Sequence, residues 1–262
     1  SLAPSVRSHF GSSNCSLMDE SCTNCAVPQH LDRWLRLWNE DQPKGFSVAT
    51  VFPQLEKYFS QLSYGIADQS IIVPLCGKTP DLLWLSQQGL CVVGVECSLR
   101  AIDLFAEENG VQLQSLECAN SSFRPWQAGA CTIFEGDWFA AIPMTFGGTF
   151  DLAYDRAALV AVDPERRPRY AEVLRSLLGV QARLLVITLE YDESLLDISV
   201  RPSFPHSICH EELRALFPDF SMQVLEEEDV GALDRFARFR AAGISSVKQY
   251  AVLLQRGHVA TL

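Results

Sequence analysis

The chain has 262 residues, 48% of them hydrophobic, which suits one α/β domain with a sizeable core. Its formal net charge is −11 at pH 7, and no Lys/Arg run makes the basic stripe that a nucleic acid would need. The sequence contains no apolar run of the roughly 20 residues that cross a membrane, and it does not open like a signal peptide. We therefore expect a cytoplasmic protein, a monomer, that binds neither nucleic acid nor membrane.

The first 28 residues are polar, contain Cys15, Cys22 and Cys25, and show neither a helical nor an alternating apolar period. We interpret residues 1–28 as a flexible leader and residues 29–262 as the folded domain. A Cys-x-x-Cys pair without a second pair is a weak signal for a metal or redox site. Most other cysteines lie in or beside apolar segments, as is typical of free thiols in a reducing cytosol.

Two helices are expected first, over residues 31–38 and 51–59, because their apolar side chains recur at helical spacing. Strands and helices then alternate. The short apolar runs at residues 71–73 and 91–96 are typical of strands buried on both faces of a parallel sheet. A helix follows each run, and Ser98 caps the second of these helices.

The alternation continues to the end of the chain. Further strands are expected at 131–134, 150–154 and 184–189, a helix from Asp163 to Gly179, a helix at 211–217, and two last strands at 221–225 and 250–254. The links between the last elements are too irregular for a crossover helix, so we expect an antiparallel hairpin there. Together these elements predict an α/β fold, with a Rossmann-like, seven-stranded, mostly parallel sheet, helices on both faces and a C-terminal antiparallel hairpin.

Ligands of such sheets bind beyond the carboxyl ends of the strands, so the residues that follow each strand are informative. Leu75 and Gly77 follow the first strand, and the missing side chain of Gly77 lets the backbone approach a ligand. The loop is neither Gly-x-Gly-x-x-Gly nor a P-loop, which argues against nicotinamide and nucleoside triphosphates. Glu96 ends the second strand, where an acid can accept hydrogen bonds from both ribose hydroxyls; alternatively it is a surface acid beside a helix start.

The next two strand ends also carry candidate site residues. Asp137 and Trp138 follow the third strand: the acid can accept a hydrogen from an adenine amino group and the indole can cover the ring, or Asp137 is only a turn residue. Asp155 and Arg156 follow the fourth strand, where a methyl acceptor would lie. A guanidinium there can steady a thiolate, although a surface salt bridge is the competing interpretation.

Two more pairs lie four residues apart. Trp34 and Trp38 either belong to the core or form a lid whose π faces suit a sulfonium cation. His206 and His210 can share a helix face, but without a third ligand they predict no metal site.

The loop and strand ends together strongly resemble the thiopurine S-methyltransferase family of class I S-adenosylmethionine-dependent methyltransferases. The resemblance rests on residues 72–78, Asp81, residues 93–96, Trp34, Trp38, Phe46, residues 136–139, residues 154–161, Pro164, and Arg238 ahead of Gly243 and Ile244. It covers the chain from about residue 31 to the C-terminus. It departs from the family at residues 194–204, where a glycine- and proline-rich loop is usual, so the acceptor preference stays open.

The resemblance implies S-adenosylmethionine as methyl donor and no metal. It implies a donor pocket lined by Trp34, Trp38, Leu75, Gly77, Glu96, Asp137, Trp138 and Arg156. It implies an acceptor pocket lined by Phe46, Arg156 and Arg238.

We expect methyl transfer to a thiol or thiolate, thiopurine-like or another small thiol. Arg156 and Arg238 would favour the anion, and Asp155 would orient Arg156 or pass a proton through water. The alternative acceptor is a small soft nucleophile such as hydrosulfide, methanethiol, selenide, halide or thiocyanate. A third hypothesis is a non-catalytic scaffold that binds a nucleoside or a protein.

Overall fold

A computed structural model describes residues 29–40, 49–66, 68–117, 122–197 and 205–257, and the predicted leader with its three cysteines lies outside them. The described strands form one sheet in the order β3-β4-β5-β2-β1-β6-β7-β9-β8. Their bounds are β1 Ser70–Val73, β2 Cys91–Glu96, β3 Leu113–Ser115, β4 Phe123–Ala128, β5 Cys131–Gly136, β6 Phe150–Arg156, β7 Leu178–Glu190, β8 Phe220–Asp229 and β9 Lys248–Arg256.

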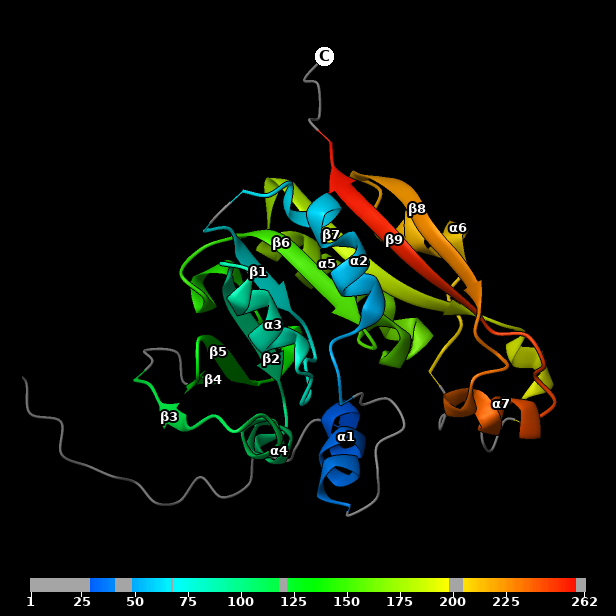
Figure 1. Cartoon of the computed structure of the whole chain (residues 1–262), viewed down its shortest axis with the longest axis horizontal. Coiled ribbons are helices and arrows are strands. Elements are labelled where there is room, and N and C mark those ends of the chain that lie inside the picture. The colour runs from blue at the N-terminus through cyan, green and yellow to red at the C-terminus, as the bar shows by residue number, and fades with distance from the viewer. Residues whose placement is uncertain (1–28, 41–48, 67, 118–121, 198–204, 258–262) are drawn as a thin grey trace, which may run out of the picture.

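The middle of the sheet is parallel, as the buried apolar runs predict. β5, β2, β1, β6 and β7 all run in one direction, with Ile72 opposite Val93 on one side and Ala153 on the other. β9 is antiparallel to both β7 and β8, which confirms the C-terminal hairpin at one edge. The Rossmann-like architecture is thus confirmed. Figure 1 shows the twisted sheet with β8 and β9 at its right-hand edge.

Seven strands were expected, but the described residues form a sheet of nine. The two additional strands, β3 and β4, are antiparallel to each other, and β4 is antiparallel to β5. β4 has Pro125 in its middle, and a proline within a run argues against a strand. β3 spans only 3 residues. A second correction concerns the helix expected from Asp163 to Gly179: a short turn covers Pro164–Arg166, and Leu178 already pairs with Phe150 in β7.

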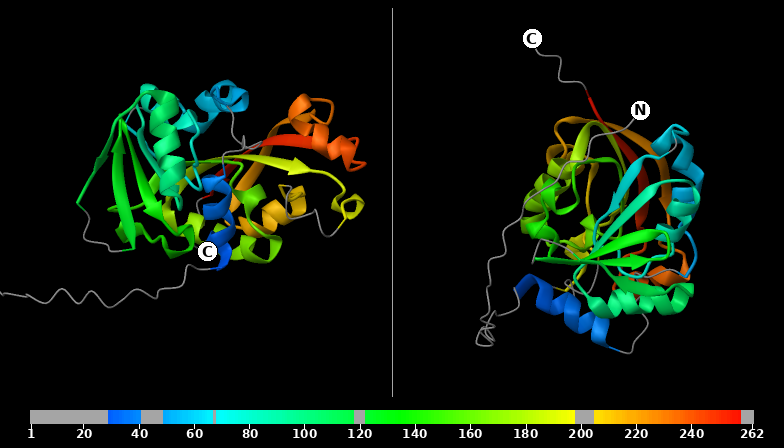
Figure 2. Two further views of the ribbon diagram at one scale, coloured as in Figure 1. Left: turned by 90° about the horizontal axis from the view of Figure 1, so that it is seen from below. Right: turned by 90° about the vertical axis from the view of Figure 1, so that its left-hand side faces the viewer.

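Helices cover both faces of the sheet, as the two side views of Figure 2 show. Their bounds are α1 Gln29–Asn39, α2 Pro53–Ser63, α3 Asp81–Gln87, α4 Leu99–Asn109, α5 Arg167–Leu177, α6 His210–Leu216 and α7 Ala237–Ala241. Leu55 of α2, Leu82 of α3 and Phe105 of α4 pack into one buried cluster. Tyr170 of α5 and Leu213 of α6 pack into a second cluster against the other face. Burial of these apolar faces stabilises the layered arrangement.

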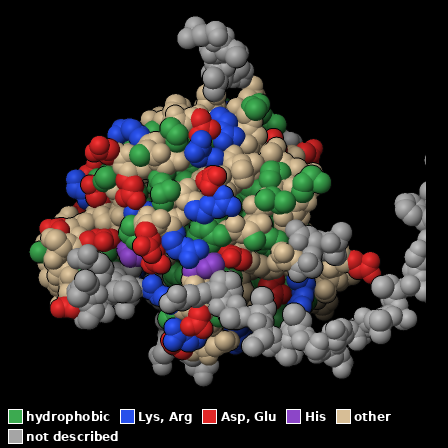
Figure 3. Space-filling model, turned by 180° about the vertical axis from the view of Figure 1, so that it is seen from behind, with side chains coloured by type: hydrophobic (Ala, Val, Ile, Leu, Met, Phe, Trp, Pro, Cys, Tyr) green, Lys and Arg blue, Asp and Glu red, His purple; other side chains and the backbone are tan. Residues whose placement is uncertain are grey.

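α1 lies apart from both layers, at the end of the sheet toward which the parallel strands point, and α7 lies at that same end (Figure 1). None of the described helices is long and apolar enough to cross a membrane. On the face seen in Figure 3, basic and acidic side chains are interspersed.

Candidate active site

A cavity of about 470 Å³ opens beyond the carboxyl ends of β1, β2, β5 and β6. Side chains from α1 and from the segment around α7 also line it. The predicted residues that line this cavity are Trp34, Trp38, Leu75, Gly77, Glu96, Asp137, Trp138, Arg156 and Arg238. The topology therefore brings together strand-end residues that are far apart in the sequence, as a parallel sheet requires.

The loop after β1 turns tightly against this cavity. Leu75 and Gly77 both have positive φ angles, 46° and 54°, a conformation that glycine adopts without penalty and leucine adopts at a cost. A Cβ atom on Gly77 would lie 3.0 Å from Cζ2 of Trp38. Glycine at this position thus keeps the loop backbone bare where α1 approaches it.

Glu96 is buried, with 4% of its surface exposed, which rules out the alternative of a plain surface acid. Its Oε2 atom accepts a hydrogen bond from the Gly77 N–H at 2.9 Å, and Oε1 accepts one from the Ser98 N–H at 2.9 Å. Burial raises the pKa of Glu96, although these N–H donors oppose the rise. Oε1 also accepts a hydrogen bond from the Cys97 thiol at 3.4 Å, so Oε2 is the oxygen that keeps a lone pair for a ligand hydroxyl.

Asp137 has the turn role that was one of the two interpretations of its sequence position, and it also contacts α1. Its Oδ1 atom accepts a hydrogen bond from the Phe139 N–H at 3.0 Å, as a turn aspartate does. Its Oδ2 atom lies 2.9 Å from Nε2 of His30 on α1. The His30 ring also meets the Phe139 ring edge to face, with centroids 5.2 Å apart. These contacts hold α1 against the mouth of the cavity.

The tryptophans form part of the cavity wall. Trp38 is buried, and Trp34, one turn earlier on α1, is partly exposed to the cavity. Trp138 is 1% exposed and packs beside Tyr170, with ring centroids 5.4 Å apart. Its indole N–H finds no hydrogen-bond partner among the described residues. Trp38 is thus buried as a core residue would be and also lines the cavity, and Trp34 lines the cavity beside it.

Asp155 does not line the cavity, which corrects the prediction that it acts on the acceptor. Its carboxylate accepts hydrogen bonds from the Leu159 N–H at 3.0 Å and from the Tyr170 hydroxyl at 2.7 Å. Burial raises the pKa of Asp155 to about 6. Successive residues of a strand point to opposite faces, so Arg156 enters the cavity while Asp155 is directed to α5.

Arg156 forms no ion pair with any acid that the structure describes, so the competing interpretation of a surface salt bridge is wrong. Its Cζ atom lies 4.8 Å from the centroid of the Phe52 ring, a cation–π distance. Arg238, on α7, lines the same cavity, whereas Phe46 lies outside the described residues.

Two charged residues line the cavity that the sequence analysis did not assign to the donor or acceptor pocket, Asp81 and Arg235. Asp81, in the first turn of α3, is fully buried in the cavity wall, and its Oδ1 atom accepts a hydrogen bond from the Phe52 N–H at 2.9 Å. Burial raises the pKa of Asp81, and the charge of Arg156 opposes the rise. An acid one turn beyond the glycine loop was a signal that could have found it. Arg235 comes from an irregular segment without any such signal.

No three potential metal ligands cluster in the part of the chain that the structure describes. Nδ1 of His206 lies 3.6 Å from Glu193, and the His210 ring instead packs on Tyr250 at 4.4 Å. The unusual stretch at 194–204 begins with the short turn Glu193–Leu195, and residues 198–204 lie outside the described residues.

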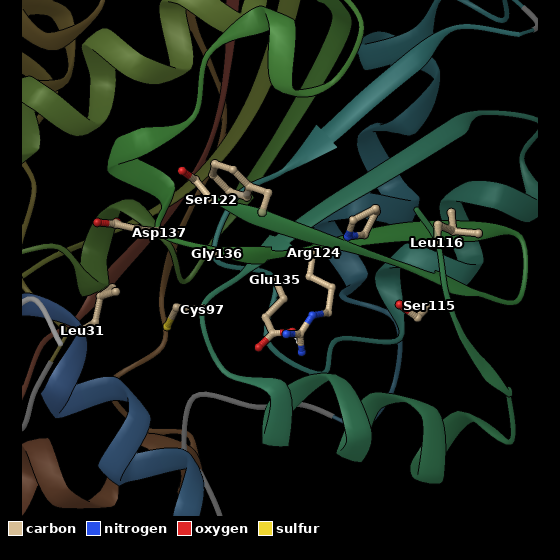
Figure 4. Close-up of a pocket in the computed structure, with 11 residues that line it drawn as sticks. Leu31, Cys97, Ser115, Leu116, Ser122, Arg124, Glu135, Gly136 and Asp137 are labelled. Carbon is tan, nitrogen blue, oxygen red and sulfur yellow. Dashed lines mark ion pairs between the residues drawn. The ribbon is translucent and has the colours of Figure 1, made fainter. Parts of the chain in front are cut away.

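A second depression of about 510 Å³ lies on the other side of α1, over β4 and β5 (Figure 4). It shares Leu31, Cys97 and Asp137 with the main cavity. The charged groups on its floor are already paired, since Glu135 lies 3.5 Å from Arg124. The main cavity is therefore the candidate active site.

Known proteins of one family are similar to this chain along most of its length. The sequence pattern of the family described as thiopurine S-methyltransferase matches residues 29–257. The chain belongs to this family. A thiopurine S-methyltransferase from Pseudomonas putida strain KT2440 is 38% identical over 214 residues, which cover 82% of this chain and 94% of that protein. One from Pseudomonas entomophila is 36% identical over 224 residues, covering 85% and 98%.

Solved structures support the same fold. An S-adenosylmethionine-dependent methyltransferase from Anabaena variabilis superposes with a TM-score of 0.58 at 15% identity, covering 88% of this chain and 96% of that one. Members of the thiopurine S-methyltransferase family use S-adenosylmethionine, and this chain is an S-adenosylmethionine-dependent methyltransferase.

Proposed function

We propose that this methyltransferase acts on sulfur: it methylates a thiol in its thiolate form and releases a thioether and S-adenosylhomocysteine. The observation that carries the proposal is Arg156, a guanidinium without an ion-pair partner among the described residues, in the same cavity as Gly77 and Glu96. The name of the related Pseudomonas proteins points to the same acceptor atom. An unpaired guanidinium favours a soft anion over a neutral amine or alcohol.

The residues present fit S-adenosylmethionine. Gly77 has no side chain to push Trp38 away from the loop, so the loop backbone and the indole can together border the donor's amino-acid end. The buried carboxylate of Glu96 keeps a lone pair for the ribose hydroxyls. Trp34 and Trp38 would face the sulfonium, and Asp137 with Trp138 would border the adenine. When bound, the donor supplies an electrophilic methyl group, which passes in line to sulfur as the old carbon–sulfur bond breaks.

The chain's own task is to present the thiolate. An ordinary thiol has a pKa of about 8.5 and is mostly protonated at neutral pH. The positive charge of Arg156 favours the anion, and Asp81, with a buried Oδ2 atom that has no hydrogen-bond partner among the described residues, accepts the thiol proton. Arg238 adds positive charge from the rim. Alignment and exclusion of water supply the rest of the acceleration.

The test is the formation of S-adenosylhomocysteine from S-adenosylmethionine with three acceptors: benzenethiol, hydrosulfide, and aniline as a nitrogen control. We expect turnover with benzenethiol that exceeds turnover with aniline by at least about 100-fold. Faster methylation of aniline would overturn sulfur as the acceptor atom. Exclusive use of hydrosulfide would replace an organic thiol by a small soft nucleophile, and no turnover with any acceptor would indicate a scaffold without activity.

A further inference from the structure

A second guanidinium, that of Arg235, lines the cavity and contacts the same aromatic residue as Arg156. The two side chains contact the same buried ring, since their Cζ atoms lie 4.8 Å and 6.0 Å from the centroid of Phe52. Arg156 reaches the ring from the end of β6, and Arg235 reaches it from the turn Asp234–Phe236. Two segments about 80 positions apart thus direct positive charge at one wall of the cavity.

The position of Arg235 is fixed by its surroundings. Its guanidinium donates a hydrogen bond at 3.2 Å to Oε1 of Gln249, a buried side chain of β9. The neighbouring Phe236 is anchored in a small apolar cluster with Phe239 and Val247. The turn and Gln249 therefore hold Arg235 in the cavity lining, although its side chain is still exposed to solvent.

Arg156 and Arg235 both bring positive charge to the cavity lining, and neither forms an ion pair with a described acid. The charge of Arg156 acts on Asp81. Partial desolvation lowers the pKa of Arg235, the charge of Arg156 lowers it further, and the charge of Glu228 opposes the change. Anionic groups bound beside the two guanidiniums would offset the repulsion between them.

We propose that Arg235 binds a carboxylate carried by the methyl acceptor while Arg156 faces its thiolate, so that the preferred substrate is an anionic thiol. This inference rests on the proposed thiol methylation. One thiolate sulfur needs one guanidinium, and the second is matched by a second anionic group on the same molecule. The planar fork of Arg suits a carboxylate, which it binds with two parallel hydrogen bonds.

The test compares 4-mercaptobenzoate with 4-mercaptobenzamide, which has the same shape without the charge. We expect the wild-type protein to have a kcat/KM at least about ten-fold higher for the carboxylate, as for one charge-assisted hydrogen bond. Arg235→Gln should remove most of that preference and leave the amide within about two-fold. Arg169→Gln is the matched control, because Arg169 is exposed and pairs only with Glu172 on α5.

Two results would overturn the inference: equal kcat/KM for both thiols in the wild type, or an equal loss for both in Arg235→Gln. A binding measurement keeps this test separate from the proposed reaction. Calorimetry of benzoate and benzamide against the protein with S-adenosylhomocysteine needs no methyl transfer. Tighter binding of benzoate than of benzamide, with the difference lost in Arg235→Gln, would support the anion site. If neither thiol were methylated, that result would refute only the proposed thiol reaction.

Discussion

The carboxylate of Glu96 accepts a hydrogen bond from the backbone N–H of Gly77 at 2.9 Å, so the end of β2 holds the loop that follows β1. The two residues are neighbours because β1 and β2 are parallel partners, with Val73 opposite Gly94. One side chain thus fixes the glycine loop and offers its remaining lone pair to the cavity.

Replacing Glu96 by Gln should weaken donor binding. The amide nitrogen of Gln would replace one of the two acceptor oxygens. It would then face the backbone N–H of Gly77 or of Ser98, and this N–H would lose its acceptor. We expect the Kd for S-adenosylmethionine, measured by calorimetry, to rise at least ten-fold, about 1.4 kcal/mol. If the folded variant bound S-adenosylmethionine with unchanged affinity, Glu96 would not be the residue that holds the ribose.

Arg156→Gln should act on the acceptor instead. The thiolate loses its counter-charge, and the buried Asp81 loses the positive charge that opposes the rise of its pKa. We expect kcat/KM for benzenethiol to fall by about 10- to 100-fold with donor affinity within a factor of three. The loss should grow as the pH falls below the pKa of the acceptor thiol, because the variant no longer favours the ionised form. Loss of donor binding in calorimetry would contradict this role.

Asp81→Asn tests the proton acceptor. Asparagine keeps an oxygen for the Phe52 N–H, so the fold of the loop should persist, but it cannot take a proton. Burial raises the pKa of Asp81, so wild-type activity should fall as the pH drops through a value above the usual range of aspartate. We expect the variant to lose this acid limb and to be slower at neutral pH. A variant that keeps the wild-type pH profile would exclude Asp81 as the base.

Asp155→Asn separates a structural carboxyl group from a catalytic one. Since Asp155 lies outside the cavity, we expect methyl transfer to change by less than about three-fold. The pKa of Asp155 is raised to about 6, so ionisation is disfavoured in the folded state. Its contribution to stability is complete below the usual aspartate pKa and is lost as the pH rises to about 6, a change on the order of 3 kcal/mol.

The measurement for Asp155 is the unfolding free energy of both proteins from pH 4 to pH 7. The variant should gain stability relative to the wild type as the pH rises, because it never ionises at this position. A difference that stays constant over this range would show that Asp155 has an ordinary pKa. If Asp155→Asn lost activity without losing stability, a catalytic role for Asp155 would be supported instead.

The strand ends were predictable because a parallel sheet brings them together whatever the intervening sequence. Short β-branched runs locate β1 and β2, and the residues that follow them, Gly77 and Glu96, must then meet at one edge. The same alternation that locates a strand also separates Asp155 from Arg156. Tyr154 and Arg156 point to the face of the strand that lines the cavity, so Asp155, which lies between them, points to the opposite face.

Other features depend on contacts that no local pattern reports. β4 was hidden by Pro125, which is tolerated because its partner β5 supplies the rest of the pairing. Arg235 comes from a stretch between β8 and β9 that has no helical or strand period. Its position depends on the packing of Phe236 against residues of distant segments, which include Tyr191 and Val247.

Gly77→Ala is the sharpest test of the donor loop, because the chain provides a matched control. Gly77 has a φ angle of 54°, where an alanine costs about 1 kcal/mol, and its new Cβ would lie 3.0 Å from Trp38. Gly65 has a φ angle of 69°, and a Cβ atom there would have nothing within 4 Å, so Gly65→Ala carries only the backbone cost. We expect Gly77→Ala to lose at least as much stability as Gly65→Ala in thermal unfolding, and only Gly77→Ala to bind S-adenosylmethionine at least ten-fold more weakly. Equal donor affinity in the two variants would mean that the loop and Trp38 do not shape the donor pocket.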